Sequence, residues 1–378
     1  MTLTSGEKKE FRGRGFTRRS FGRLATMIAA GSTLPFYNES ALAQLSQVKG
    51  APPDAVMINA NENPLGPCAE AAEAIHNVVA KGGRYMYGEA DSLAEILAEQ
   101  EGLKANYVEA FAGSSPPLHQ AVLAFTSPSK PFVMGNPGYE SGEKAAKFIG
   151  AKVVKVPLTK DYRHDVKAMV GVANAGLIYI SNPNNPTGTL TPQDEIEWLV
   201  ANKPMGSVVM IDEAYTHIAG APFNSGLVAA DKDVIILRTF SKIYGMAGLR
   251  AGAAFARPDL LDKITPYSSG GMPVAGMVGA QASLKSKNVV AERRKIIQDV
   301  REDVLAFLDK HRFSYVPSVS NKFMVDVKRP GNDIVMALRN EKVYIGRVWD
   351  IWPTHVRVSV GTPEEMAKFK TAFLKVMA

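Results

Sequence analysis

Residues 234–250 read VIILRTFSKIYGMAGLR, an apolar run that passes into hydroxyl side chains, a lysine and a glycine-containing turn. The four apolar residues that open it predict a buried strand. A lysine at the buried end of a strand loses its proton readily, so Lys242 can attack a carbonyl. Arg250 and the hydroxyls of Thr239 and Ser241 suit a phosphate. The segment therefore predicts a site for a phosphorylated carbonyl compound, although taken alone a surface lysine after a core strand is the simpler interpretation.

Other short apolar runs of this kind alternate with helical patterns along the chain. The helical patterns cover residues 69–80 and 91–101, the second with Asp91 and Ser92 as candidate caps. The additional predicted strands are 132–134, 153–156, 177–180 and 208–211. This alternation predicts an α/β fold, with a mostly parallel sheet flanked by helices. Ligands bind at the carboxyl ends of strands in such sheets, and the polar motifs follow the apolar runs directly.

The pattern of predicted helices and strands changes after about residue 281. A long charged helix is expected over roughly 285–311, followed by a strand at 321–327, a helix near 332–340, a strand at 355–360 and a final helix from about 363. This pattern indicates a smaller α+β domain. We therefore expect a large domain over 85–280, and a small domain formed by 44–84 together with 281–378.

Three further motifs follow predicted strands. Gly113, Ser114 and Ser115 precede a helical stretch at 118–125. Glycine allows a ligand to approach the backbone closely, and hydroxyls and free amides at the start of a helix bind phosphate. The motif therefore suits a phosphate site, and an ordinary capped helix start is the alternative interpretation. Residues 181–188, SNPNNPTG, follow the strand at 177–180 and present the amide of Asn185.

The third motif is Asp212-Glu213-Ala214-Tyr215, which follows the strand at 208–211. A carboxylate at a buried strand end needs a cationic partner, unless it is simply an N-cap. A pyridinium nitrogen is such a partner, and Tyr215 could bond the phenolic oxygen of the same ring. The spacing from Asp212 to Lys242 allows one crossover helix, so both side chains can reach one ring. An aldehyde, a phosphate and a pyridinium together describe pyridoxal 5'-phosphate (PLP).

These motifs, with NANENPLG at residues 59–66, resemble those of fold-type I PLP-dependent aminotransferases of class I/II. The similarity covers about residues 50–378 and is greatest to the histidinol-phosphate aminotransferase branch. It implies a catalytic set in which Lys242 is the Schiff-base lysine and Asp212 the partner of the pyridine nitrogen. Tyr215 and Asn185 match the residues that hold the phenolic oxygen, and Tyr139 matches the aromatic residue that stacks on the ring.

The same resemblance implies the remaining cofactor and substrate contacts. The phosphate cradle would comprise Gly113, Ser114, Ser115, Thr239, Ser241 and Arg250. Tyr85 resembles a tyrosine that reaches the partner's phosphate, so a homodimer with shared active sites is expected. Arg357 matches the arginine that pairs with the substrate carboxylate, and Asn63 and Arg347 are candidate substrate ligands. Arg347 lies near the position that holds a substrate phosphate, although a solvated arginine is an equal alternative.

The implied activity moves an amino group from an amino acid or similar amine, histidinol-phosphate-like or aromatic, to a 2-oxo acid such as 2-oxoglutarate. Two departures affect the substrate assignment: Pro116-Pro117 replaces a frequently acidic position, and Met86 replaces the proline of Arg-Tyr-Pro. A PLP-dependent decarboxylase of a phosphorylated amino acid is the first alternative. A non-catalytic PLP-binding protein is the second. Such regulators carry a DNA-binding domain before the PLP fold, where this chain has only a signal-like segment.

Residues 1–43 carry seven basic and three acidic side chains, more than half of the net charge of +7. They combine TRRSF at 17–21, a weakly apolar stretch at 24–30 and Ala41-Leu42-Ala43. This anatomy predicts a twin-arginine-like signal peptide and a periplasmic enzyme; a disordered basic tail on a cytoplasmic enzyme is the alternative. Because histidine biosynthesis is cytosolic, an exported relative is expected to use another donor.

Composition excludes several other classes of protein. The sequence has no basic stripe interleaved with aromatic residues, so nucleic-acid binding is not expected. It has no apolar stretch long enough for a stable membrane insertion. Cys68 is the single cysteine, so the chain forms no internal disulfide, and the six scattered histidines predict no metal site. The sequence therefore predicts small-molecule partners.

Overall fold

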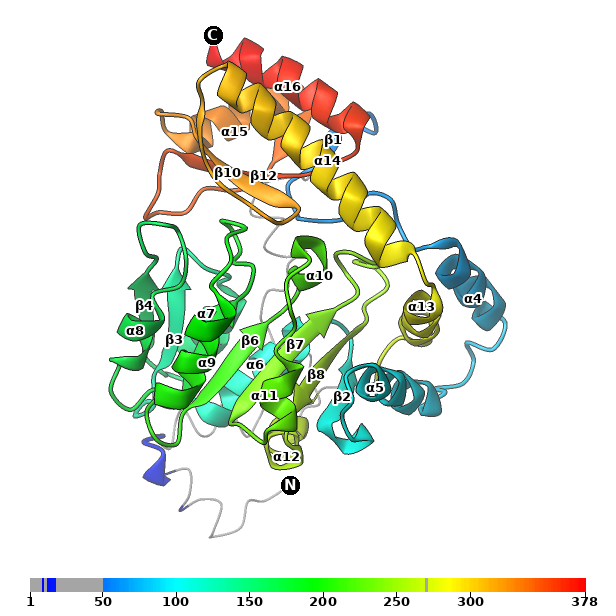
Figure 1. The fold of residues 1–378 in the computed structure, drawn as a ribbon, viewed down its shortest axis with the longest axis vertical. Helices are drawn as coiled ribbons and strands as arrows, with labels where there is room; N and C mark the ends of the chain where they lie inside the picture. Colours follow the sequence, from blue (N-terminus) through cyan, green and yellow to red (C-terminus); the bar gives the residue numbers. More distant parts are fainter. Residues whose placement is uncertain (1–8, 10–11, 18–49, 269–270) are drawn as a thin grey trace.

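The computed structural model describes residues 9, 12–17, 50–268 and 271–378 (Figure 1). Its largest sheet has seven strands in the order β2-β8-β7-β6-β5-β3-β4, and every neighbouring pair is parallel except those of β8. The strands are β2 (Val108–Phe111), β3 (Phe132–Asn136), β4 (Val153–Pro157), β5 (Leu177–Ser181), β6 (Val208–Asp212), β7 (Val234–Thr239) and β8 (Gly252–Ala256). The predicted fold class is confirmed.

The central strands are apolar throughout because both faces of the sheet are covered. Every residue of β5, β6 and β7 is buried. Alternate residues pack to opposite sides, as the two-residue period of a strand requires. Ile178, Val209 and Ile236 join one core cluster, which includes residues of α9 (Gln193–Asn202) and α11 (Ser225–Ala229). Tyr179, Met210 and Ile235 join another, with residues of α6 (Ser115–Phe125), α7 (Ser141–Phe148) and α12 (Pro258–Ile264).

Strands β2 and β8 have no counterpart among the predicted strands. Strand β8 reads GAAFA and runs antiparallel to both β7 and β2. Its small residues lack the β-branched signal on which the prediction depended, yet all five are buried between neighbouring strands. The remaining short elements near this sheet are η1 (Ala105–Tyr107), α8 (Val166–Val170), α10 (Thr216–Ala219) and η2 (Thr265–Tyr267).

Two smaller sheets lie beyond the carboxyl ends of the large one, at the top of Figure 1. One is antiparallel, with the order β12-β10-β9, and the other pairs β1 with β11 in parallel. Their strands are β1 (Val56–Ile58), β9 (Ser314–Val316), β10 (Lys322–Asp326), β11 (Val343–Ile345) and β12 (His355–Ser359). The helices beside them are α14 (Val289–Lys310), α15 (Gly331–Asn340) and α16 (Pro363–Met377). The proposed domain boundaries stay a prediction.

The long charged helix expected over roughly 285–311 is confirmed as the single helix α14, which begins a few residues later, at Val289. The helix before it, α13 (Val274–Lys285), was not predicted. One helix prediction needs correction. The second helix of the chain's first half, α5 (Gly88–Gln100), begins before Asp91 and Ser92, so neither residue caps it. Asp91 nevertheless lies in the first turn, where the helix dipole favours a negative charge. Helix α4 (Ala69–Val79) packs against α13 and ends one residue before its predicted limit.

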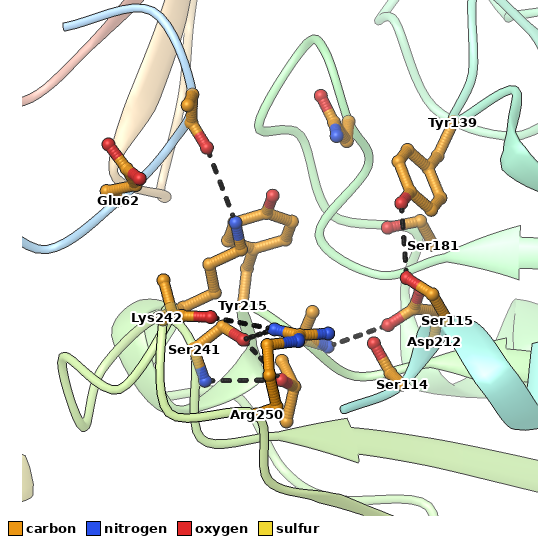
Figure 2. Close-up of a pocket in the computed structure, with 16 residues that line it drawn as sticks. Glu62, Ser114, Ser115, Tyr139, Ser181, Asp212, Tyr215, Ser241, Lys242 and Arg250 are labelled. Atoms are coloured by element: carbon orange, nitrogen blue, oxygen red, sulfur yellow. Dashed lines mark hydrogen bonds between the residues drawn. The ribbon is translucent and has the colours of Figure 1, made fainter. Parts of the chain in front are cut away.

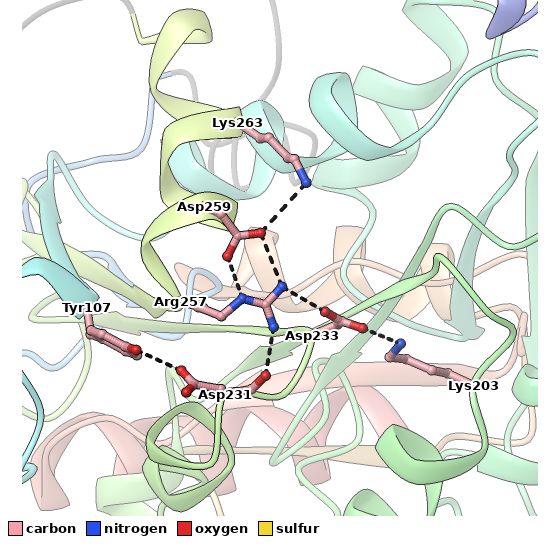
Figure 3. A network of polar contacts seen from close by, with 7 residues as sticks. All are labelled: Tyr107, Lys203, Asp231, Asp233, Arg257, Asp259 and Lys263. Carbon is pink, nitrogen blue, oxygen red and sulfur yellow. Dashed lines mark hydrogen bonds and ion pairs between the residues drawn. The ribbon is translucent and has the colours of Figure 1, made fainter.

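Charged side chains tie together the amino ends of the parallel strands, at the edge opposite the small sheets (Figure 3). Asp233, just before β7, pairs with Lys203 at 2.9 Å and with Arg257 at 3.1 Å. Arg257 follows the antiparallel β8 and also donates to the backbone oxygen of Asp231 at 2.7 Å. The Tyr107 hydroxyl donates to the Asp231 carboxylate at 2.7 Å. This edge of the sheet therefore carries a network of ion pairs and hydrogen bonds between charged and polar side chains.

The described N-terminal residues lie against α6. One guanidinium nitrogen of Arg14 donates to backbone oxygens at the end of this helix, those of Leu123, Ala124 and Thr126, at 3.0, 2.8 and 3.1 Å. Phe16 is buried and belongs to the core cluster on this side of the sheet. The twin arginines and the expected cleavage site fall at residues 18–43, outside the described residues. Within the described part of the chain, no helix is long and apolar enough to cross a membrane.

Candidate active site

A cavity of about 320 Å³ lies where the carboxyl ends of β5, β6 and β7 face the small sheets (Figure 2). This volume is in the range of small-molecule sites. Ten of the predicted site residues line it: Ser114, Ser115, Tyr139, Asn185, Asp212, Tyr215, Thr239, Ser241, Lys242 and Arg250. The other five, Gly113, Tyr85, Arg357, Asn63 and Arg347, do not.

Asp212 is the last residue of β6 and is buried at the base of the cavity. Its carboxylate accepts from the Tyr179 hydroxyl at 2.9 Å and from the Ala214 amide at 3.1 Å. Burial raises the pKa of Asp212 to about 6, against the opposing effects of these two donors and of the charges on Lys242 and Lys322. A cation in the cavity would restore the charged carboxylate, so the site suits a protonated ring nitrogen.

Lys242 follows β7 and extends into the cavity from the neighbouring strand end (Figure 2). Its side chain is buried, and its amine lies 3.5 Å from the backbone oxygen of Ala60. The same amine lies 5.6 Å from the centre of the Tyr215 ring. Because β6 and β7 are adjacent and parallel, Asp212 and Lys242 open onto one cavity. This is the arrangement that a carbonyl compound with a basic ring nitrogen requires.

The candidate phosphate cradle is formed at the start of α6 and by Arg250. Ser114 is the N-cap of α6, but its side chain makes no capping hydrogen bond, and Ser115 begins the helix. Arg250 donates to the Ser241 hydroxyl at 3.2 Å and to the backbone oxygens of Ala247 and Ala112 at 2.8 and 3.0 Å. A helix start, hydroxyls and a fixed guanidinium form an anion site.

Gly113 shapes this cradle without lining the cavity. Its φ is +97°, and a Cβ at this position would collide with the guanidinium of Arg250. Glycine is therefore required both by the backbone conformation and by the close approach of the arginine.

Asn185, Asn61 and Arg357 form a polar cluster beside the cavity. Arg357 is buried and donates to the Asn185 side-chain oxygen at 2.9 Å and to the Asn59 backbone oxygen at 2.6 Å. The Asn61 amide lies 3.2 Å from the Tyr215 hydroxyl and 3.4 Å from the Asn185 oxygen. These contacts connect β12 to both residues that are expected to hold a phenolic oxygen.

The remaining predicted ligands have other surroundings. Asn63 donates to the Ile243 backbone oxygen at 3.0 Å and so fixes the turn after Lys242. Arg347 forms an ion pair with Glu140, the residue after Tyr139, and its guanidinium lies 4.5 Å from the centre of the Trp349 ring. Tyr85 is 79% exposed and stacks on Tyr87, with ring centres 5.4 Å apart.

The sequence prediction missed several residues at this site. Tyr179 lies inside an apolar run, so nothing distinguished it from core residues. Asn61 was part of a quoted motif but was given no role. Lys322 is fully buried and its amine lies 3.0 Å from the centre of the Tyr215 ring, a contact between segments far apart in the chain. Glu62 lines the cavity and was also not singled out. Within the described residues, no group of three or more histidine, cysteine or acidic side chains could hold a metal.

Comparisons with known proteins identify relatives of this chain. The profile of the aminotransferase class I and II family matches residues 53–373. The chain is 35% identical to histidinol-phosphate aminotransferase 1 of Nitrosococcus oceani, over 83% of this chain and 87% of that protein. It is 33% identical to histidinol-phosphate aminotransferase of Symbiobacterium thermophilum, over 84% and 90% of the two chains. The crystal structure of histidinol-phosphate aminotransferase from Sinorhizobium meliloti with pyridoxal-5'-phosphate has a TM-score of 0.80 and 26% identity, and covers 91% of this chain and 95% of that one.

Proposed function

Because the chain belongs to the aminotransferase class I and II family, we propose that it transfers an amino group from a histidinol-phosphate-like or aromatic amine to a 2-oxo acid such as 2-oxoglutarate. It is a PLP-dependent aminotransferase. The observation that supports this activity most directly is the convergence of Asp212 and Lys242, from adjacent parallel strand ends, on one cavity.

The residues around the cavity fit PLP. Asp212 would hold the ring nitrogen, and Tyr215 and Asn185 the phenolic oxygen. The ring face would lie against Tyr139, and the phosphate would bind Arg250 with the serines and threonine of the cradle. Bound PLP supplies an electron sink for the charge that develops on the donor's α-carbon. The buried Asp212 suits this chemistry because an anion next to the ring nitrogen would keep that nitrogen protonated.

The chain's own residues carry the proton transfers. The Lys242 amine removes the proton from the donor's α-carbon as a general base, and its conjugate acid later returns a proton. The neutral amine is the form that acts as a base. Arg357 would pair with the substrate carboxylate, because its planar guanidinium can form two parallel bonds. Its contacts with Asn185 and Asn59 hold that guanidinium beside the cavity.

The ion pair of Arg347 bears on the identity of the amino donor. The relatives are named for a phosphorylated donor. In this chain the arginine that could receive a phosphate already has a carboxylate partner, Glu140. A donor phosphate at Arg347 would have to displace the Glu140 carboxylate, and if it did not, the two anions would repel each other. This pair favours a donor without a phosphate, such as an aromatic amino acid.

A donor screen tests the proposal. Purified protein with PLP is mixed with histidinol phosphate or aromatic amino acids, and the change in cofactor absorbance and the 2-oxoglutarate-dependent product are measured. At least one donor should change the absorbance spectrum of the bound cofactor. The variant Lys242→Ala should show no turnover, and borohydride should leave no reduced pyridoxyl adduct on it. Release of carbon dioxide without a keto product would instead assign a decarboxylase.

The assembly is proposed to be a homodimer with shared active sites. Tyr85 and Tyr87 stack on each other at the surface, at 79% and 68% exposure, and Val79 nearby in the sequence is 68% exposed. Exposed aromatic and apolar side chains gathered in one segment are typical of a surface that another chain covers.

Export is also proposed from the sequence. The twin arginines, the apolar stretch and the small-residue cleavage site of residues 1–43 support a periplasmic enzyme that folds around its cofactor before transport. N-terminal sequencing of the protein from separated periplasm and cytosol tests this. A mature chain that begins near Gln44 in the periplasm is the expected result, and an intact chain found solely in the cytosol would contradict it.

A further inference from the structure

Lys322 is a buried lysine to which the mechanism above gives no role. It begins β10 and has no exposed surface. Lysine is almost never fully buried unless it is paired, because removing an ammonium from water is unfavourable. Its presence in the interior therefore requires a reason other than packing.

Strand register directs this lysine toward the active site. In the antiparallel pair of β10 and β12, Lys322 lies opposite Ser359, and Met324 lies opposite Arg357. Residues opposite each other share a face, and alternate residues of a strand point to the same side. The intervening residues of β10, Phe323 and Val325, belong to the hydrophobic core instead. Lys322 therefore lies on the same face as Arg357, which is the face next to the cavity.

The contacts of the amine are specific. Lys322 Nζ donates to the Ser320 hydroxyl at 2.9 Å and lies 3.0 Å from the centre of the Tyr215 ring. A cation over an aromatic face is attracted to the ring, and the attraction is strongest where water is excluded. Tyr215 lines the cavity, and its hydroxyl lies 3.2 Å from the Asn61 amide. One ring thus has a cation on its face and its hydroxyl beside the ligand space.

We propose that Lys322 is a positioning residue that acts through Tyr215, so that its charge makes the Tyr215 hydroxyl a stronger hydrogen-bond donor to the phenolic oxygen of PLP. The proposal rests on the proposed function for the identity of that ligand. A positive charge near a phenol stabilises the electron-rich oxygen that remains as its proton is shared. A stronger donor at Tyr215 would favour the negatively charged form of the cofactor's phenolic oxygen, and the pH midpoint of the bound cofactor would be lower as a result.

Other charged and titratable groups around this ring come from several elements. They are Lys242 after β7, Asp212 on β6, Tyr179 on β5, Arg357 on β12, Glu62 after β1, and Tyr139. Lys322 also lowers the pKa of Asp212 slightly through its charge. A test must therefore separate an effect through Tyr215 from a direct effect of the charge on the cofactor.

A double-mutant cycle makes this separation. The variants are Lys322→Met, which removes the charge at similar volume, Tyr215→Phe, and the two combined. The readout is the pH midpoint of the absorbance change of bound PLP, with circular dichroism and borohydride trapping at Lys242 to verify fold and loading. We expect K322M to raise the midpoint by about half a pH unit or more, about a threefold change in the proton equilibrium. In the Y215F background the same substitution should change it little.

The outcomes distinguish the possible explanations. An equal shift in both backgrounds would mean that Lys322 acts directly, and no shift in either would mean that it is structural; both overturn the proposal. Met324→Leu, on the same face of β10, is the packing control and should leave the midpoint unchanged. If K322M does not fold, Lys322→Gln removes the charge but can still bond Ser320, and the same cycle applies.

A second readout does not depend on the cofactor. In the apoprotein, the ultraviolet difference titration between wild type and Y215F isolates the ionisation of Tyr215. K322M should move that ionisation to higher pH, because the phenolate loses a neighbouring cation. Failure to bind PLP at Lys242 would refute the proposed function but leave this titration valid. An unchanged Tyr215 titration would refute the role of Lys322 alone.

Discussion

The Tyr179 hydroxyl donates to the Asp212 carboxylate at 2.9 Å, across the neighbouring strands β5 and β6. Both side chains are buried, and the contact fixes the carboxylate at the strand end that opens onto the cavity. Burial raises the pKa of Asp212 to about 6 all the same. In the apoprotein the charged carboxylate is therefore unfavourable for folding despite these contacts, and a cationic ring would stabilise it further.

Asp212→Asn should stabilise the apoprotein at about pH 8 by about 1–3 kcal/mol while it weakens PLP binding. The stabilisation is expected because folding raises the pKa of Asp212. A carboxyl whose pKa is raised on folding favours the folded state when protonated, and this contribution is lost as pH rises from about 4 to about 6. Above that range the wild type carries the full penalty of the buried charge. Urea unfolding of apo wild type and D212N at about pH 8 and about pH 4 measures it.

At about pH 4 the difference between the two proteins should nearly vanish, since Asp212 is then protonated in the folded wild type. A difference of the same size at both pH values would show that asparagine acts through packing instead. Tyr179→Phe is the matched control, because it removes one donor to the carboxylate while the charge stays. It should destabilise the apoprotein at neutral pH rather than stabilise it.

Much of the large sheet could be predicted because its strands are buried on both faces and read as continuous apolar runs. The polar motifs that follow those runs also reach one cavity, since parallel strands end at one edge. Lys242 and Asp212 are examples. Strand β8 could not be predicted, because glycine and alanine carry little strand preference and its burial comes from its neighbours.

The parts of the site that escaped prediction depend on contacts between distant segments. Lys322 reaches Tyr215 only because β10 pairs with β12 in a particular register. Tyr179 resembles its apolar neighbours in sequence, and the acceptor of its hydroxyl lies on another strand. The partner of Arg347 is likewise on a different part of the chain, so the sequence could not separate a ligand of a substrate phosphate from a solvated arginine, and it did not indicate the ion pair with Glu140.

Glu140→Gln should improve the use of a phosphorylated donor, because Arg347 would lose its carboxylate partner and could receive a phosphate. We expect KM for histidinol phosphate to fall about tenfold, which corresponds to about 1.4 kcal/mol of binding. The KM for an aromatic amino acid without a phosphate should change less than about twofold. Steady-state kinetics with both donors measures the difference.

Glu143→Gln is the control for this experiment. It removes the same charge three residues away, from a carboxylate that pairs with Lys147 at 2.6 Å and Lys155 at 2.8 Å. That substitution should leave the ratio of the two KM values unchanged. An equal change for both donors in E140Q would argue against a phosphate subsite at Arg347.

Tyr85→Phe should weaken PLP binding about tenfold in a homodimer, because the lost hydroxyl would have bonded the phosphate in the partner's site. The aromatic ring stays, so the stack on Tyr87 and the association of the chains should be retained. Tyr87→Phe is the matched control and should bind PLP normally. Sedimentation tests the assembly directly, and a monomer that binds PLP as tightly as its Y85F variant would refute the shared site.

Phe16→Ala should destabilise the full-length chain. The chain that begins at residue 44 lacks Phe16 altogether. Phe16 is buried in the core cluster beside α6, and Arg14 bonds three backbone oxygens at the end of that helix. We expect F16A to lower the free energy of unfolding by about 1–3 kcal/mol, because the substitution removes a buried aromatic ring from this core cluster. Thermal unfolding of full-length wild type, full-length F16A and residues 44–378 measures this. Because removal of residues 1–43 also removes Phe16, the shorter chain should resemble F16A rather than wild type. If the shorter chain is as stable as the full-length wild type, these contacts contribute nothing to the stability of the folded enzyme.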